Sequence, residues 1–113
     1  MELRCPDPAA NPYLALAVCL AAGLDGIENK IMPPEEVREN VFEMRLSRKV
    51  EKGIVSLPGD LMEAIEEFEH DDYIKGVLGP HITEKYAEAK KAEWADYRAQ
   101  VTQWEIDEYL YKI

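Results

Sequence analysis

The feature that most constrains this chain is an apolar segment that begins at Pro12 and runs to about Glu28. Asn11 can cap a helix there, and Pro12 then stands at the first helical position, where its missing N–H costs nothing. The apolar side chains of the segment fall on nearly every face of a helix instead of one stripe. We therefore predict a central helix over residues 12–28, with other elements packed on more than one side of it.

A short alternating stretch precedes this helix. Glu2 and Arg4 alternate with Leu3 and Cys5, and residues i and i+2 of a strand share one face. We therefore predict the end of a β-strand here. On a strand, the Glu2 carboxylate could hold a hard cation such as Mg²⁺, and the Arg4 guanidinium beside it could bind carboxylate or phosphate oxygens. Taken alone, the pair is more simply a surface ion pair.

The middle of the chain has weaker signals. Residues 35–44 predict a short turn of helix, and the residues after it predict a charged loop. Lys and Arg residues at 45, 48, 49 and 52 stand among acidic ones, so we interpret them as a solvated surface in preference to an anion site. Asp60 is a good cap for a helix. The helix that follows it has an apolar stripe at i, i+3, i+4 and i+7, namely Leu61, Ala64, Ile65 and Phe68.

Three further helices follow in the last third. Asp71 or Asp72 caps a short one that Gly79-Pro80 closes, and a long helix spans about 82–99. The long helix is expected to turn these residues inward: Ile82, Tyr86, Ala89, Trp94 and Tyr97. Thr102 and Glu105 have capping-box spacing and start a last helix. The predicted fold class is mainly α with a short N-terminal β-strand, in a single domain over residues 1–113.

The end of the chain stays apolar and aromatic, although a chain terminus is normally polar and frays. The residues concerned are Trp104, Ile106, Tyr109, Leu110, Tyr111 and Ile113. We expect this tail to dock, and the sequence leaves open whether it docks on its own domain or on another subunit.

Composition narrows the possible partners and location. The chain has 23 acidic and 13 basic residues, a formal net charge of −10, so we expect neither nucleic acid nor an anionic membrane as a direct partner. The apolar run in residues 12–24 is shorter than the about 20 residues that span a bilayer. Cys5 and Cys19 lack metal-binding spacing and are expected to be buried free thiols in a reducing compartment. We predict a cytoplasmic protein without a signal peptide.

No complete catalytic constellation is apparent. The two histidines, His70 and His81, have no Ser or Cys nucleophile at a recognisable motif, and no phosphate-binding glycine loop occurs. The acidic runs lack the spacing of a calcium loop and are expected to be solvated faces.

The stretch ELRCPDPAANPYLALAVCLAAGLDGIENK nevertheless resembles the type I glutamine synthetases of bacteria and archaea. In that family a strand with the pattern R-[IV]-E-[LV]-R leads into PDP-x-x-NPYLA, and AGLDGI-x-NK follows. The similarity is close from Glu2 to Lys30 and continues more loosely to Tyr109. It implies that the 113 residues are the C-terminal portion of the catalytic domain of such an enzyme.

The resemblance also implies an activity and roles for two residues. The family makes glutamine from glutamate, ammonia and ATP through γ-glutamyl phosphate, with Mg²⁺ or Mn²⁺. Glu2 falls on a metal ligand of the family, and Arg4 falls on a substrate-binding arginine. The other metal ligands are expected outside these residues, so we predict that the 113-residue chain alone binds no cofactor and is inactive.

The expected partners are the N-terminal part of the enzyme and further copies of the chain, a dodecamer in the family. The alternative is a free-standing helical interaction module that binds a protein through its aromatic tail.

Overall fold

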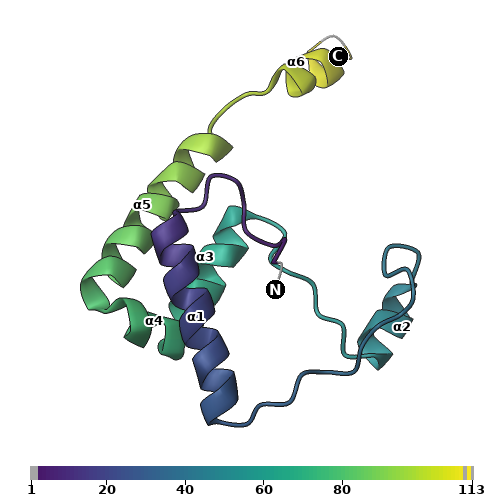
Figure 1. The fold of residues 1–113 in the computed structure, drawn as a ribbon. Coiled ribbons are helices and arrows are strands. Elements are labelled where there is room, and N and C mark those ends of the chain that lie inside the picture. The colour runs from purple at the N-terminus through teal and green to yellow at the C-terminus, as the bar shows by residue number, and fades with distance from the viewer. Residues whose placement is uncertain (1–2, 111, 113) are drawn as a thin grey trace.

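The computed structural model describes residues 3–110 and residue 112, and its regular structure is helical throughout (Figure 1). The helices are α1 Pro12–Glu28, α2 Leu46–Glu51, α3 Leu61–His70, α4 Asp72–Leu78, α5 Pro80–Arg98 and α6 Gln103–Tyr109. The mainly α class is confirmed.

The described residues contain no strand, so the predicted N-terminal β-strand is not seen. Leu3 to Cys5 have irregular backbone, and Glu2 lies outside the described residues. A strand requires a neighbouring extended segment to pair its N–H and C=O groups. The described part of the chain offers these residues no such segment, and the alternating pattern alone cannot supply one.

Most of the predicted helix starts are confirmed, because each is determined by a side chain next to the helix. The Asn11 Oδ1 accepts hydrogen bonds from the N–H groups of Tyr13 (3.0 Å) and Leu14 (3.3 Å). Asp60 caps α3 and Asp71 caps α4 in the same way, each at 2.9 Å. Such caps typically contribute about 1 kcal/mol each, so these boundaries are encoded locally.

Helices α3, α4 and α5 form the packed part of the molecule. Ile65 of α3 and Ala87 of α5 are its buried residues, at 4% and 6% exposed. Beside them, the Phe68 and Tyr86 rings meet edge to face with 6.0 Å between centroids. The predicted stripe of α3 does face this contact, since its four members are buried or half-buried.

The predicted inward face of α5 was largely wrong. The residues that turn inward are Thr83, Ala87, Lys90 and Trp94, of which only Trp94 was expected. The small side chains of Thr83 and Ala87 explain why α5 turns this face inward instead of the expected one. Thr83 and Ala87 let α5 come close to α3 and α4, and Tyr86 then lies at the rim, 37% exposed.

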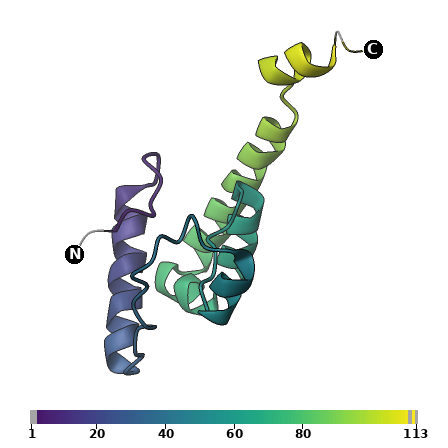
Figure 2. The same ribbon diagram turned by 90° about the vertical axis from the view of Figure 1, so that its right-hand side faces the viewer.

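Helix α1 spans the predicted residues but is not enclosed. It packs on α4, where the Tyr73 hydroxyl donates a hydrogen bond of 2.8 Å to the carbonyl oxygen of Ala21. Partial desolvation, together with the carboxylates of Asp25 and Glu28, raises the pKa of Tyr73. No residue of α1 is buried, and Figure 2 shows the helix as a column beside α3, α4 and α5.

Helix α2 corrects the prediction for the middle of the chain. Of the short turn of helix expected over residues 35–44, only two hydrogen-bonded turns form, at residues 40–44, and α2 forms where a loop was expected. The Glu39 carboxylate lies 2.8 Å from Arg48 and 3.3 Å from Lys52, which stand about one turn apart. These two cations lower the pKa of Glu39. Local sequence does not reveal such a contact between residues nine or more positions apart.

The described molecule is extended, 59 × 41 × 23 Å. Its accessible surface of 10163 Å² compares with about 6,300 Å² for a compact protein of this mass. Its radius of gyration is 18.4 Å, against about 13 Å for a compact domain of this length. Within the described residues, α2 and α6 pack on no other helix. Much apolar surface is therefore uncovered, and a single domain over residues 1–113 stays a prediction.

Candidate functional site

The two predicted site residues lie at the entrance to α1. Arg4 is exposed on the irregular segment before the helix, and its neighbour Leu3 is 51% exposed. Glu2, the predicted metal ligand, lies outside the described residues, so its position relative to Arg4 stays a prediction.

A tight turn attaches this segment to the helical body. The Asp7 carboxylate accepts a 2.7 Å hydrogen bond from the N–H of Ala9, and the Asp7 carbonyl accepts a 2.9 Å bond from the N–H of Ala10. Asn11 then caps α1 immediately after the turn. The backbone between Asp7 and α1 is therefore held by local hydrogen bonds.

The same segment forms one wall of an open cavity of about 660 Å³. Cys5 and Asp7 line it from one side, and residues of α3 and α5 line it from the other. Its floor is mainly apolar, formed by Leu57, Leu61, Ala64, Ile65 and Phe68.

A charged pair stands at the rim of this cavity. The Lys90 ammonium donates a 2.6 Å hydrogen bond to Glu93, and this bond, with Asp7 nearby, raises the pKa of Lys90. Lys90 also lies 5.8 Å from the Tyr86 ring centroid. The arrangement suits binding of a mixed apolar and charged surface, and among the residues lining it we find no nucleophile with a base beside it.

A metal site is not complete in the part of the chain that the structure describes. No group of three or more His, Cys, Asp or Glu side chains there could hold an ion. The acidic side chains of residues 60–72 serve partly as helix caps, and the two histidines are exposed. The described residues therefore do not fit Mg²⁺ by themselves.

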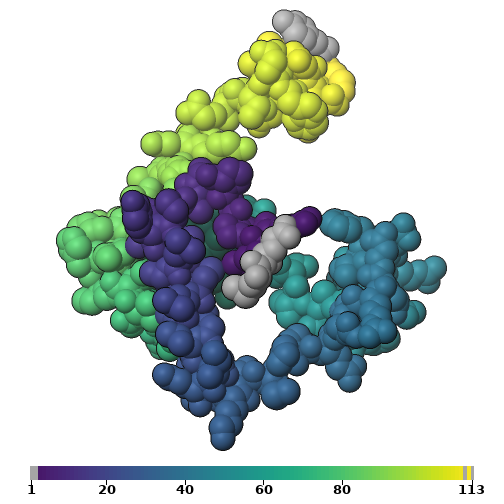
Figure 3. All heavy atoms as spheres, in the orientation of Figure 1, coloured from purple at the N-terminus to yellow at the C-terminus, as the bar shows by residue number. Residues whose placement is uncertain are grey.

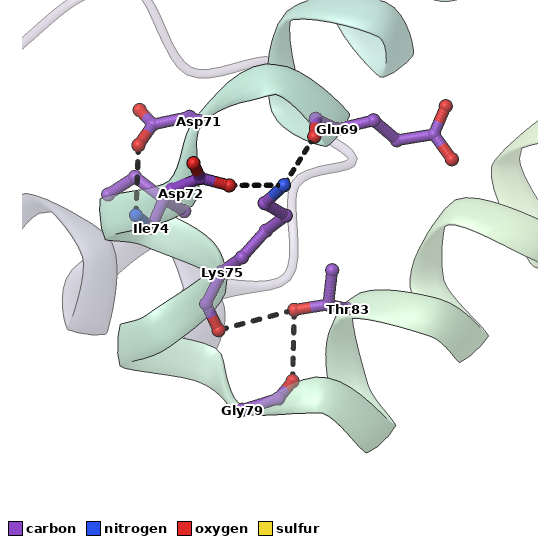
Figure 4. A network of polar contacts seen from close by, with 7 residues as sticks. All are labelled: Glu69, Asp71, Asp72, Ile74, Lys75, Gly79 and Thr83. Atoms are coloured by element: carbon purple, nitrogen blue, oxygen red, sulfur yellow. Dashed lines mark hydrogen bonds and ion pairs between the residues drawn. The ribbon is translucent and has the colours of Figure 1, made fainter.

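Lys75, which belongs to no predicted motif, joins α3 to α4 (Figure 4). Its ammonium donates to the carbonyl oxygen of Glu69 at 2.6 Å and lies 2.7 Å from the Asp72 carboxylate. Lys75 thereby lowers the pKa of Asp72. Across the next turn, the Thr83 hydroxyl donates to the carbonyl oxygen of Gly79 at 2.9 Å. The cluster is structural, and the i,i+3 spacing of Asp72 and Lys75 was its only sequence signal.

The sequence of this chain matches a known protein family and several of its members. The family model described as glutamine synthetase, catalytic domain, matches residues 1–109. The glutamine synthetase of Thermotoga maritima is 52% identical over 111 residues, which are 98% of this chain and 25% of that protein. The glutamine synthetase of Methanocaldococcus jannaschii is 50% identical over 110 residues, or 97% of this chain and 24% of that one.

A solved structure described as "Apo GmaS without ligand" is similar in fold. Its TM-score is 0.74 at 41% identity, covering 96% of this chain and 24% of the other. The chain thus spans about a quarter of the length of the curated relatives it matches. Among the described residues, none of the helices has the length and apolar character needed to cross a membrane.

Proposed function

This chain belongs to the glutamine synthetase family, and from that premise we propose that it forms the C-terminal quarter of an ATP-dependent glutamate–ammonia ligase. The observation that carries the proposal is the match to the catalytic-domain model over residues 1–109, while the chain spans only about a quarter of its relatives. The excess accessible surface supports it, because a self-sufficient domain of this mass would expose far less.

The proposed activity of the whole protein is the formation of glutamine from glutamate, ammonia and ATP, with Mg²⁺ or Mn²⁺. A divalent metal bound in the complete enzyme would supply positive charge that stabilises phosphoryl transfer. We assign Glu2 as one metal ligand and Arg4 as a group that binds glutamate and the transferring phosphoryl oxygens. An arginine suits both, because its planar fork donates two parallel hydrogen bonds to carboxylate or phosphate.

The 113 residues alone should be inactive. One carboxylate and one guanidinium cannot enclose two metal ions, ATP and glutamate. The proposed partners are therefore the remaining three-quarters of the same enzyme and other copies of the complete chain. We propose that the complete enzyme is a dodecamer and that it lies in the cytoplasm.

A chimera tests the proposal directly. Residues 1–113 replace the matching quarter of the Thermotoga maritima relative, which is 52% identical to them, and glutamine formation is measured with ATP and Mg²⁺. We expect an active chimera, an inactive isolated chain, and a loss on the order of 100-fold or more for Arg4→Leu, as for removal of other charge-stabilising donors. Arg38→Leu is the matched control, since Arg38 is an exposed arginine paired with Glu36.

The interaction-module alternative predicts a different pattern and is not favoured by the match along nearly the whole chain. Under it, Glu2→Gln and Arg4→Leu would leave function unchanged, whereas Trp104→Ala would abolish it. A chimera with full activity in Arg4→Leu would contradict the assignment of Arg4. Glutamine formation by the isolated chain would contradict the proposal that its site is incomplete.

A further inference from the structure

Helix α1 has two apolar faces, and only one of them is in contact with the rest of the structure. The half-buried side includes Leu14, Val18 and Ala21, and it faces α4. The opposite side carries five large apolar residues that are 49% to 83% exposed, which we call the outer ridge: Tyr13, Leu16, Leu20, Leu24 and Ile27. A helix that is apolar all round is typical of a protein interior, so the outer ridge lacks a cover that its composition requires.

The outer ridge has the form of a docking surface. Its members follow one another at intervals of three or four residues, so they lie in a row along one side of the helix. A shallow apolar groove of about 360 Å³ accompanies the row, lined by Leu16, Cys19, Leu20, Gly23, Leu24 and Ile27. No atom lies within 4 Å of a Cβ placed on Gly23, which leaves an open notch for an approaching backbone. Figure 3 shows α1 along its length at the surface of the molecule.

The uncovered area of the chain as a whole bears on the size of the occupant. The accessible surface of 10163 Å² exceeds the compact value by about 3,900 Å². This excess includes the surfaces of α2 and α6, which pack on no other helix among the described residues. A body several times larger than this chain could cover the outer ridge together with these surfaces, whereas a standard interface of about 800 Å² per partner would cover only part of the excess.

A further observation favours the rest of the same polypeptide as the occupant. The relatives are about four times as long as this chain, so such a body exists in each of them.

We propose that the outer ridge of α1 is the surface on which the remaining three-quarters of the glutamine synthetase polypeptide packs. This inference rests on the proposed function and adds a location: the contact runs along α1 from Tyr13 to Ile27, with Gly23 as the point of closest approach. It makes α1 the joint between the helical body of α3–α5 and the part of the enzyme that carries the other active-site residues.

Cys19 is a natural reporter for this packing, because it lines the groove and its side chain is only half-buried in this chain. The rate of its alkylation by iodoacetamide is followed by peptide mass spectrometry in the isolated chain and in the chimera described above. We expect Cys19 to react at least about tenfold more slowly in the chimera. Cys5, which is outside the groove, serves as the internal reference within the isolated chain.

Substitutions on the ridge identify the surface. Leu20→Asp should restore Cys19 alkylation in the chimera to nearly the rate of the isolated chain, and Leu20→Met, which keeps an apolar side chain, should not. Leu46→Asp is the matched control, since Leu46 is a similarly exposed leucine on α2. In the isolated chain, Leu20→Asp should leave helix content unchanged, because no packing is lost there.

The outcomes separate this inference from the proposed function. An active chimera in which Cys19 reacts as fast as in the isolated chain overturns the inference and leaves the function standing. A chimera that protects Cys19 but makes no glutamine supports the packing and contradicts the function. Sedimentation of the isolated chain is the second measurement. A dimer that protects Cys19, and that Leu20→Asp dissolves, would make a second copy the occupant and overturn the proposal.

Discussion

Helices α3–α5 and helix α1 are both apolar, yet only the first group is satisfied by its own neighbours. In α3–α5 the side chains of Ile65 and Ala87 are buried, the starts of α3 and α4 are capped by side chains, and Lys75 joins two of the helices. In α1 the cap is equally good, but no residue is buried. The difference shows that capping and helix formation are local properties, whereas burial depends on which other parts of the protein are present.

The largest expected effect lies in the packed group. Ile65→Ala removes a side chain that is 4% exposed, and it should lower the free energy of unfolding of the isolated chain by about 2–4 kcal/mol. Urea denaturation followed by circular dichroism measures it. Leu46→Ala at an exposed leucine of α2 should change the same quantity by less than about 0.5 kcal/mol. Equal losses in both variants would mean that α3–α5 is not the stable part.

A smaller effect is expected at the contact between the two regions. Tyr73→Phe removes the hydrogen bond to the Ala21 carbonyl and should weaken the packing of α1 on α4 by about 1 kcal/mol. Amide hydrogen exchange within α1 should then be roughly fivefold faster, while exchange in α3 stays unchanged. Tyr97→Phe, at an exposed tyrosine of α5, is the control. Unchanged exchange in α1 would show that this bond does not hold α1 in place.

The smallest effect concerns α6, which has a capping box but no packed neighbour among the described residues. Hydrogen bonds from the backbone and hydroxyl of Thr102 lower the pKa of Glu105 below its usual 4.5. A depressed pKa contributes stability that is present above pH 4.5 and is lost as the pH falls through the folded-state pKa. Helicity at α6, followed by NMR chemical shifts, should therefore decrease in acid.

Thr102→Ala is the matched variant for that titration. It should have less α6 helix at neutral pH and a weaker acid dependence below pH 4.5, since Glu105 loses the hydroxyl of Thr102 and keeps only the backbone N–H of residue 102. An identical acid transition in both proteins would mean that the capping box does not control α6.

The parts of the fold that were predictable from the sequence are those determined by near neighbours. Asn11, Asp60 and Thr102 act within four residues, and so their helices begin where expected. The contact of Glu39 with Arg48 and Lys52 spans nine or more positions of the chain. The face that α5 turns inward depends on the sizes of residues in other helices. Neither relation is visible in a local pattern.

The candidate site was predictable only to the level of residue type. Glu2 and Arg4 were recognised through the motif that surrounds them, and the family match bears out the motif but not their roles. The predicted strand is not seen among the described residues for the same reason that the site is incomplete. Both require atoms from segments that the described residues do not contain.

Hydrogen–deuterium exchange of the isolated chain and of the chimera, compared peptide by peptide, tests whether α1 is covered by another part of the polypeptide. If the two regions differ because the cover of α1 lies elsewhere in the polypeptide, the α1 amides should exchange at least about tenfold more slowly in the chimera, with a smaller change around Ile65. If α1 is already as protected as α3 in the isolated chain, or gains no protection in an active chimera, the cover of α1 does not lie elsewhere in the polypeptide.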